Sequence, residues 1–164
     1  MIMLLLPKNR IRSLRLMGSI LLLLPFFLKA QPTANRFISK YRPIADSLAA
    51  VYGIPSSVIL GISLLESGAG TSRNARLLKN YFGIVGKNNL RQTHGIRTRY
   101  RQYNTDTGSF VDFCRLMTRK KFYASLKNNP SPTLWIKAIS ATGYSEVPAI
   151  WQKRVLGTIR QHRL

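Results

Sequence analysis

The sequence is poor in acidic residues, cysteine and histidine, and this excludes several classes of protein. Of its 164 residues, 26 are Lys or Arg but only five are Asp or Glu. The single cysteine, Cys114, excludes a disulfide within the chain. His94 and His162 stand apart, without the spacing of zinc ligands. Because a glycine-rich phosphate loop is also absent, the sequence predicts neither a metal site nor a cofactor.

Glu66 is the most informative of the few acidic residues, because it directly follows the apolar segment Val58–Leu65. The segment is long enough for a buried helix, and Gly68 is well placed to end it. The helix dipole and the apolar neighbours would both raise the pKa of Glu66. A carboxylic acid that keeps its proton near neutral pH can act as a general acid. The alternative is a glutamate that simply reaches water at the end of the helix.

The N-terminal region predicts export. A basic start is followed by the apolar run Leu16–Leu28, and residues 1–30 have the order of a secretory signal peptide, cleaved after Ala30. The run has 13 residues, fewer than the roughly 20 that span a bilayer. We therefore expect no membrane span after cleavage, with an uncleaved anchor as the alternative. Residues 31–35 are expected to be a linker to one domain over residues 36–164, located in the periplasm or cell envelope.

The charge of the mature chain predicts a polyanionic partner. Removal of residues 1–30 takes away five of the 26 basic residues and no acidic one, which leaves a net charge of +16. Nucleic acid, anionic lipid and anionic envelope polymers would all be attracted. The alternating basic and aromatic residues of Arg97–Tyr103 could form a stacking platform for nucleic acid. The export signal argues against nucleic acid and favours envelope polymers.

The periodicity of apolar residues predicts a mostly helical α+β fold. The segment Gly86–Tyr103 differs, because its second half alternates and predicts a small β-hairpin. Ser56 or Ser57 could cap the helix that carries Glu66. Ser109 and Asp112 have the spacing of a capping box. The expected helices cover residues 36–52, 56–66, 71–78, 109–120, 133–139 and 149–160.

Several short motifs, in the same order, resemble glycoside hydrolase family 73, the bacterial peptidoglycan N-acetylglucosaminidases. The resemblance covers about residues 36–162 and implies a lysozyme-like α-lobe, a small β-hairpin lobe and a sugar-binding cleft between them. The motifs are Phe37–Tyr41 leading to Leu64–Gly70, Asn80–Ile84, Tyr100–Tyr103 followed by Ser109, Phe110 and Asp112, and Gly143–Tyr144.

The resemblance also implies roles for individual residues. Glu66 matches the catalytic glutamate, which protonates the leaving glycosidic oxygen, and Tyr144 matches an active-site tyrosine near the reacting sugar. The rings of Tyr81 and Phe82 could form the floor of the cleft, with core packing as the alternative. The full set of expected substrate-binding residues is Asn80, Tyr81, Phe82, Gly83, Tyr103 and Glu146.

One expected feature of the family is missing. Its members commonly have a second carboxylate in the β-lobe, but Gly86–Tyr103 contains neither Asp nor Glu. Three explanations are open: the substrate's 2-acetamido group acts as the nucleophile, Glu146 reaches in from the tyrosine loop, or the protein binds glycan without cutting it. The favoured function is an exported endo-β-N-acetylglucosaminidase acting on peptidoglycan. A lytic transglycosylase, which also uses one glutamate, is a close alternative.

Overall fold

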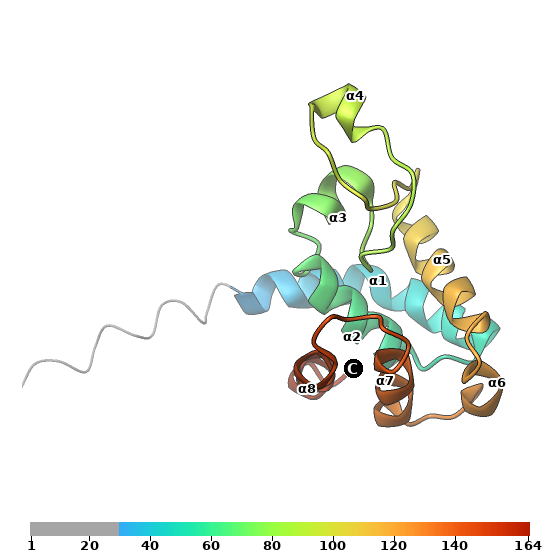
Figure 1. Cartoon of the computed structure of the whole chain (residues 1–164). Helices are drawn as coiled ribbons and strands as arrows, with labels where there is room; N and C mark the ends of the chain where they lie inside the picture. The colour runs from blue at the N-terminus through green and yellow to red at the C-terminus, as the bar shows by residue number, and fades with distance from the viewer. Residues whose placement is uncertain (1–29) are drawn as a thin grey trace, which may run out of the picture.

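The computed structural model describes residues 30–164, and these residues form eight helices (Figure 1). The predicted signal peptide, apart from Ala30, lies outside the described residues. None of the helices between residues 30 and 164 is both long and apolar enough to cross a bilayer. The helices are α1 (Ala30–Tyr52), α2 (Ser56–Ser67), α3 (Arg73–Leu78), α4 (Leu90–His94), α5 (Asp106–Thr118), α6 (Tyr123–Leu126), α7 (Pro132–Ser140) and α8 (Pro148–Gln161).

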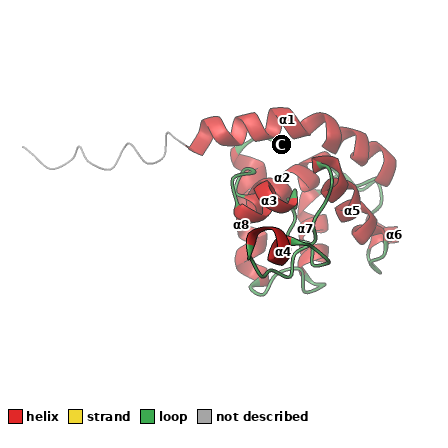
Figure 2. Cartoon of the chain, turned by 90° about the horizontal axis from the view of Figure 1, so that it is seen from above, coloured by secondary structure: helices red, strands yellow, loops and turns green. Residues whose placement is uncertain are grey.

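Helix α2 lies at the centre of the fold and packs against α1, α7 and α8 (Figures 1 and 2). Every residue from Val58 to Leu64 is buried, as expected of a helix that is apolar on all sides. The helix ends as predicted: Gly68 adopts a left-handed conformation with φ 56°, and its N–H bonds to the carbonyls of Leu64 and Leu65. Glu66 is thereby placed in the last turn of a fixed helix.

Several predicted boundaries are corrected by the structure. The expected linker, residues 31–35, continues α1, and Ala34 is already buried in the core. No serine side chain caps α2; instead the carbonyl of Pro55 accepts hydrogen bonds from the backbone N–H groups of Val58 and Ile59. Helix α5 begins at Asp106, and Thr105 caps it by accepting from the N–H of Gly108. The capping box expected at Ser109 is therefore not formed.

The expected β-hairpin is reduced to one antiparallel bridge between Val85 and Tyr100, and residues 30–164 contain no longer strand. The short helix α4, which the sequence did not predict, lies between the two bridged residues. Part of the pairing is made by a side chain: the Asn88 amide donates to the carbonyls of Thr98 and Tyr100. These carbonyls therefore have partners without a continuous second strand.

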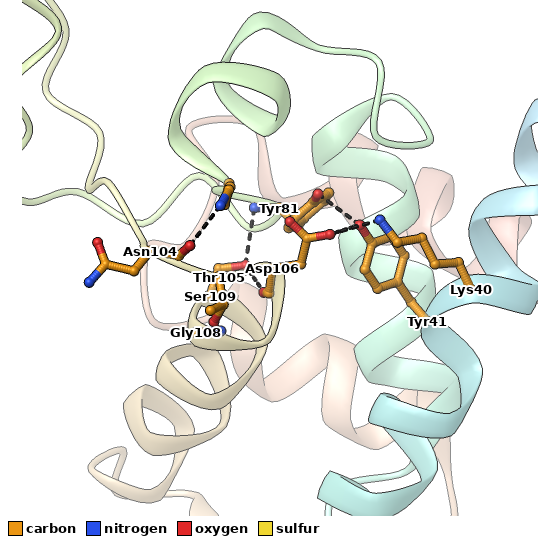
Figure 3. Close-up of polar contacts among 9 residues, drawn as sticks. Lys40, Tyr41, Tyr81, Asn104, Thr105, Asp106, Gly108 and Ser109 are labelled. Carbon is orange, nitrogen blue, oxygen red and sulfur yellow. Dashed lines mark hydrogen bonds and ion pairs between the residues drawn. The ribbon is translucent and has the colours of Figure 1, made fainter.

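The start of α5 is tied to α1 by a polar cluster (Figure 3). Asp106 accepts hydrogen bonds from Lys40 Nζ at 2.8 Å and from the Tyr41 hydroxyl at 2.7 Å, and the Tyr41 and Tyr81 hydroxyls are 2.7 Å apart. Burial acts to raise the pKa of Asp106, but the hydrogen bonds from Lys40 and the two tyrosines together lower it. Asp106 is thus an ionised structural partner in the first turn of α5.

The close contact between α2 and α8 gives a stability prediction. A Cβ atom on Gly61 would lie 2.5 Å from Ile159 Cγ1, whereas nothing lies within 4 Å of a Cβ on Gly157, which is also helical. We expect Gly61→Ala to reduce the free energy of unfolding by about 1–3 kcal/mol, because α8 must shift. Gly157→Ala should raise it by about 0.5–1 kcal/mol, because alanine lowers the entropy of the unfolded chain. Urea unfolding measures both, and equal effects would contradict this view of the interface.

Candidate active site

Glu66 lies between α8 and the loop that follows α3. Its Oε1 accepts a hydrogen bond of 2.7 Å from the indole Nε1 of Trp151 in α8. Its Oε2 faces Gly83, where a Cβ atom would lie 3.9 Å away. Trp151 is only 5% exposed, while Glu66 itself keeps an exposed surface. The carboxylate is therefore held by a buried side chain, on a residue that keeps part of its surface in solvent.

The surroundings of Glu66 favour its protonated form. Desolvation raises the pKa of Glu66, and this effect exceeds the opposing effects of the Trp151 hydrogen bond and the positive charge of Arg154. The residue is exposed when its whole surface is considered, but enough protein surrounds the carboxyl group for burial to dominate. A proton donor that is reachable and has a raised pKa meets the two requirements of a general acid.

Tyr144 is connected to Glu66 through Trp151. The ring of Tyr144 lies 5.3 Å from that of Trp151 and makes an edge contact with Phe113. Its hydroxyl donates a 2.7 Å hydrogen bond to the carbonyl of Phe82. Burial, and then the charge of Glu66, raises the pKa of Tyr144 well above its usual value. Tyr144 is therefore a neutral phenol that joins its loop to the loop facing Glu66.

Asn80 organises the loop rather than presenting a free amide. Its Nδ2 donates to the carbonyls of Ile84 and Arg101 at 2.8 and 2.9 Å, and its Oδ1 accepts from the N–H of Ile84 at 3.1 Å. The residue is 2% exposed. Within this loop, Gly83 has φ 68° and turns its backbone toward Glu66. The expected substrate contact of Asn80 is thus replaced by an indirect role, the positioning of Gly83.

The rings of Tyr81 and Phe82 belong to the core, which corrects the expectation that they form the floor of a cleft. They are 6% and 2% exposed. Tyr81 packs against Tyr41 and Phe110, and Phe82 is stacked on Phe113 with ring centroids 4.3 Å apart. The reason is that both rings fill the space beside α5, so that their faces are covered by protein.

Tyr103 and Asp112 form a second polar cluster. Asp112 accepts from Arg101 Nη1 at 2.6 Å and from the Tyr103 hydroxyl at 2.7 Å. Burial, followed by the hydrogen bond to Asp112, raises the pKa of Tyr103, which stays protonated. Asp112 therefore anchors the segment before α5 instead of capping that helix. The same contacts occupy Arg101 and Tyr103, two residues of the basic-aromatic segment.

Glu146 lies at the surface of the tyrosine loop. Its side chain is 94% exposed, and its Oε1 lies 4.0 Å from Arg99 Nη2, a distance typical of a weak surface ion pair.

The structure thus brings together Glu66, Tyr144 and Gly83, with Asn80 and Phe82 behind them. Sequence reasoning did not single out Trp151, because no local motif marks it. No group of three or more His, Cys, Asp and Glu side chains suited to a metal ion occurs within the described part of the chain.

The fold is shared with a glycoside hydrolase domain, an autolysin and a peptidoglycan hydrolase. The glycoside hydrolase domain of FlgJ from Salmonella typhimurium aligns with a TM-score of 0.60 and 20% identity, over 79% of this chain and 88% of that domain. The catalytic domain of the autolysin Auto from Listeria monocytogenes aligns with a TM-score of 0.62 and 18% identity, over 89% and 97%. A peptidoglycan hydrolase mutant from Sphingomonas sp. A1 aligns with a TM-score of 0.57 and 19% identity, over 78% and 96%. The fold is therefore lysozyme-like and mostly helical.

The sequence itself defines the family. The profile described as "Glucosaminidase: Mannosyl-glycoprotein endo-beta-N-acetylglucosaminidase" matches residues 42–164, most of the chain. The chain therefore belongs to the glucosaminidase family, glycoside hydrolase family 73, which confirms the resemblance noted in its motifs. Curated protein sequences give no match to the chain.

The hydrogen bond to Trp151 predicts a shift in the titration of Glu66. Because that bond favours the ionised form, Trp151→Phe should raise the pKa of Glu66 further, while the new ring still packs on Tyr144. Carbon NMR of the Glu66 carboxyl group measures the shift directly. Trp135→Phe is the matched control, because the Trp135 indole bonds instead to the carbonyl of Asn129. An unchanged or lowered pKa in Trp151→Phe would contradict the assignment.

Proposed function

We propose that this protein is an exported hydrolase that cleaves peptidoglycan glycan strands at N-acetylglucosamine, with Glu66 as the general acid. The observation that carries the proposal is Glu66 itself, a partly exposed residue whose carboxylate is hydrogen-bonded to buried Trp151 and whose pKa is raised by desolvation. Membership of a glycoside hydrolase family supports the reaction class. The structural similarity to an autolysin and a peptidoglycan hydrolase supports the substrate class.

The chemistry begins with the proton on Glu66. Protonated Glu66 donates to the glycosidic oxygen as the bond to the sugar breaks, and the oxygen leaves as a hydroxyl group. The carboxylate that remains is stabilised by the Trp151 N–H and by the charge of Arg154, the two groups that favour its ionised form. Tyr144 keeps its own proton and holds the tyrosine loop against the Phe82 carbonyl. The loop facing Glu66 thus stays in place during the reaction.

The nucleophile is assigned to the substrate. The carbonyl oxygen of the 2-acetamido group attacks the anomeric carbon from the face opposite Glu66 and forms a cyclic intermediate. Water then opens this intermediate, and ionised Glu66 takes a proton from the water. Two findings support this assignment. Asp106 and Asp112 are already held by basic and tyrosine side chains, and Gly86–Tyr103 contains no acid.

The location and partners follow from the sequence and the family. The signal peptide predicted over residues 1–30 would deliver the protein to the periplasm or cell envelope, where peptidoglycan lies. The net charge of +16 after cleavage would attract anionic envelope polymers. The reaction as written uses no cofactor. The Gly83 and Tyr103 segments, together with Glu146 on the tyrosine loop, are proposed to border the bound sugar chain.

A non-catalytic wall-binding module is the second candidate, favoured by the missing β-lobe carboxylate. Such a protein would sediment with purified sacculi and release no reducing ends. A lytic transglycosylase would release products with anhydro sugar ends, whereas hydrolysis leaves reducing ends. Mass spectrometry of digested sacculi distinguishes these three activities.

The first test replaces the acid. Glu66→Gln should lower the release of reducing ends from sacculi by about 10²–10⁴-fold, because the general acid is lost. The circular dichroism spectrum should be unchanged, since the side chain lies outside the core. The matched control is Asp46→Asn, which makes the same change at an exposed position on α1. Full activity in Glu66→Gln would reject the proposal.

The second test asks whether Glu146 supplies a second carboxylate. If the substrate provides the nucleophile, Glu146→Gln should lower activity far less than Glu66→Gln, because it removes only a weak surface ion pair with Arg99 and a contact at the border of the sugar chain. Reducing ends released from sacculi are again measured. A loss as large as that of Glu66→Gln would instead identify a two-carboxylate mechanism.

A further inference from the structure

A cavity of about 520 Å³ lies between the start of α1, the end of α2 and the last turns of α8. In Figures 1 and 2 the start of α1 and α8 are on the same side of the molecule. The volume is within the range of about 300–1,000 Å³ that is usual for ligand sites. Of its lining residues, only Arg154 takes part in the mechanism above.

The cavity begins beside the candidate active site. Leu65 and Gly68, which line it, lie on either side of Glu66 in the chain. Arg154, which also lines it, follows Trp151 by three positions on α8 and so shares a helix face with the residue that holds Glu66. A ligand in the cavity would therefore be joined to a sugar at Glu66 by only a short link.

The lining of the cavity suits a short acidic peptide better than a sugar ring. It includes Arg154 and His162 but neither Asp nor Glu, so a carboxylate would be attracted. It contains no Phe, Tyr or Trp, the side chains whose faces suit sugar rings. Its apolar part, which includes Ala34 and Leu64, would cover small aliphatic side chains.

Two of the three threonine hydroxyl groups that line the cavity, those of Thr71 and Thr158, are arranged as acceptors. Thr71 Oγ1 donates its proton to the Gly68 carbonyl at 2.6 Å, and Thr158 Oγ1 donates to the Arg154 carbonyl at 3.0 Å. Each oxygen therefore offers lone pairs and no further donor. Acceptors of this kind match the N–H groups of a peptide backbone, while the guanidinium of Arg154 matches its carboxylate.

We propose that this cavity binds the acidic stem peptide that peptidoglycan carries on its sugars, with Arg154 pairing with a peptide carboxylate. The inference rests on the proposed function, because it places the sugar at Glu66 and the attached peptide beside it. It adds a specificity for glycan strands that still carry their peptides.

The test measures binding rather than cleavage. Two soluble glycan fragments of equal length are used, one with its stem peptide and one after an amidase has removed the peptide. Calorimetry gives the Kd of each fragment for the full chain carrying Glu66→Gln. This variant does not cut the fragments, and it has no charge at position 66 for Arg154 to act on. We expect the peptide-bearing fragment to bind about tenfold more tightly, the effect of one good charge-assisted contact.

A matched pair of variants tests the role of Arg154. Adding Arg154→Gln should remove most of the preference for the peptide-bearing fragment, whereas Lys153→Gln should keep it. Lys153 is the neighbouring residue of α8 and is also exposed, but it does not line the cavity. Thr158→Phe, which fills the cavity without a change of charge, should also remove the preference.

Two results would overturn the inference. If the Glu66→Gln protein with an unaltered cavity binds both fragments equally well, the peptide is not recognised. If Arg154→Gln weakens both fragments by the same factor, the cavity is a sugar subsite. Failure of the proposed function is seen separately, as no cleavage of either fragment by the protein that retains Glu66.

Discussion

The complete burial of α2 is the constraint on which the rest of the structure depends. Because every residue from Val58 to Leu64 is covered, the helix cannot rotate or slide without exposing apolar surface to water. The left-handed Gly68 then ends the helix one turn past this buried stretch, so Glu66 has a fixed position at the surface. The absence of a side chain at Gly61 lets α8 approach closely, and the same approach brings Trp151 to Glu66. The contact between α2 and α8 thus both packs the core and fixes the position of the Glu66 carboxylate.

Opposite α2, the side chains of two asparagines make hydrogen bonds to backbone groups that paired strands would make in a sheet. The Asn80 side chain donates through its amide nitrogen and accepts through its amide oxygen, and these bonds hold the loop that presents Gly83. The Asn88 side-chain amide donates to the carbonyls of Thr98 and Tyr100 in the facing segment. Side-chain pairing of this kind fixes individual loop positions without a continuous ladder. The segment beside Glu66 can therefore have an irregular course and still be held in place, with the Tyr144 hydroxyl adding a third tie at the Phe82 carbonyl.

The sequence predicted most helices and the position of Glu66, because both depend on local signals: apolar periodicity and a glycine directly after the apolar run. It did not predict Trp151, since contact between that residue and Glu66 joins positions 85 apart in the chain. The alternation near Arg99 predicted a strand, but a strand also needs a partner of similar length. The segment that pairs with it is short, because α4 begins at Leu90, and one bridge is all that forms there. Tyr81 and Phe82 also show that local sequence does not predict contacts with distant elements, because an aromatic pair in a motif does not reveal whether another helix covers its faces.

A strongly basic protein is an unfavourable setting for an acid that must keep its proton, because nearby positive charge lowers a carboxyl pKa. In the structure, most of the positive charge lies away from Glu66. Among the described residues, Arg154 is the basic side chain whose charge acts on the pKa of Glu66, and desolvation outweighs it. Charges farther away are screened within about 8 Å at physiological salt, so they can attract a polyanion and still leave the proton on Glu66. If Arg154 pairs with a ligand carboxylate, its effect on Glu66 would weaken as substrate binds, and the acid would hold its proton most firmly when the bond to be cut is in place.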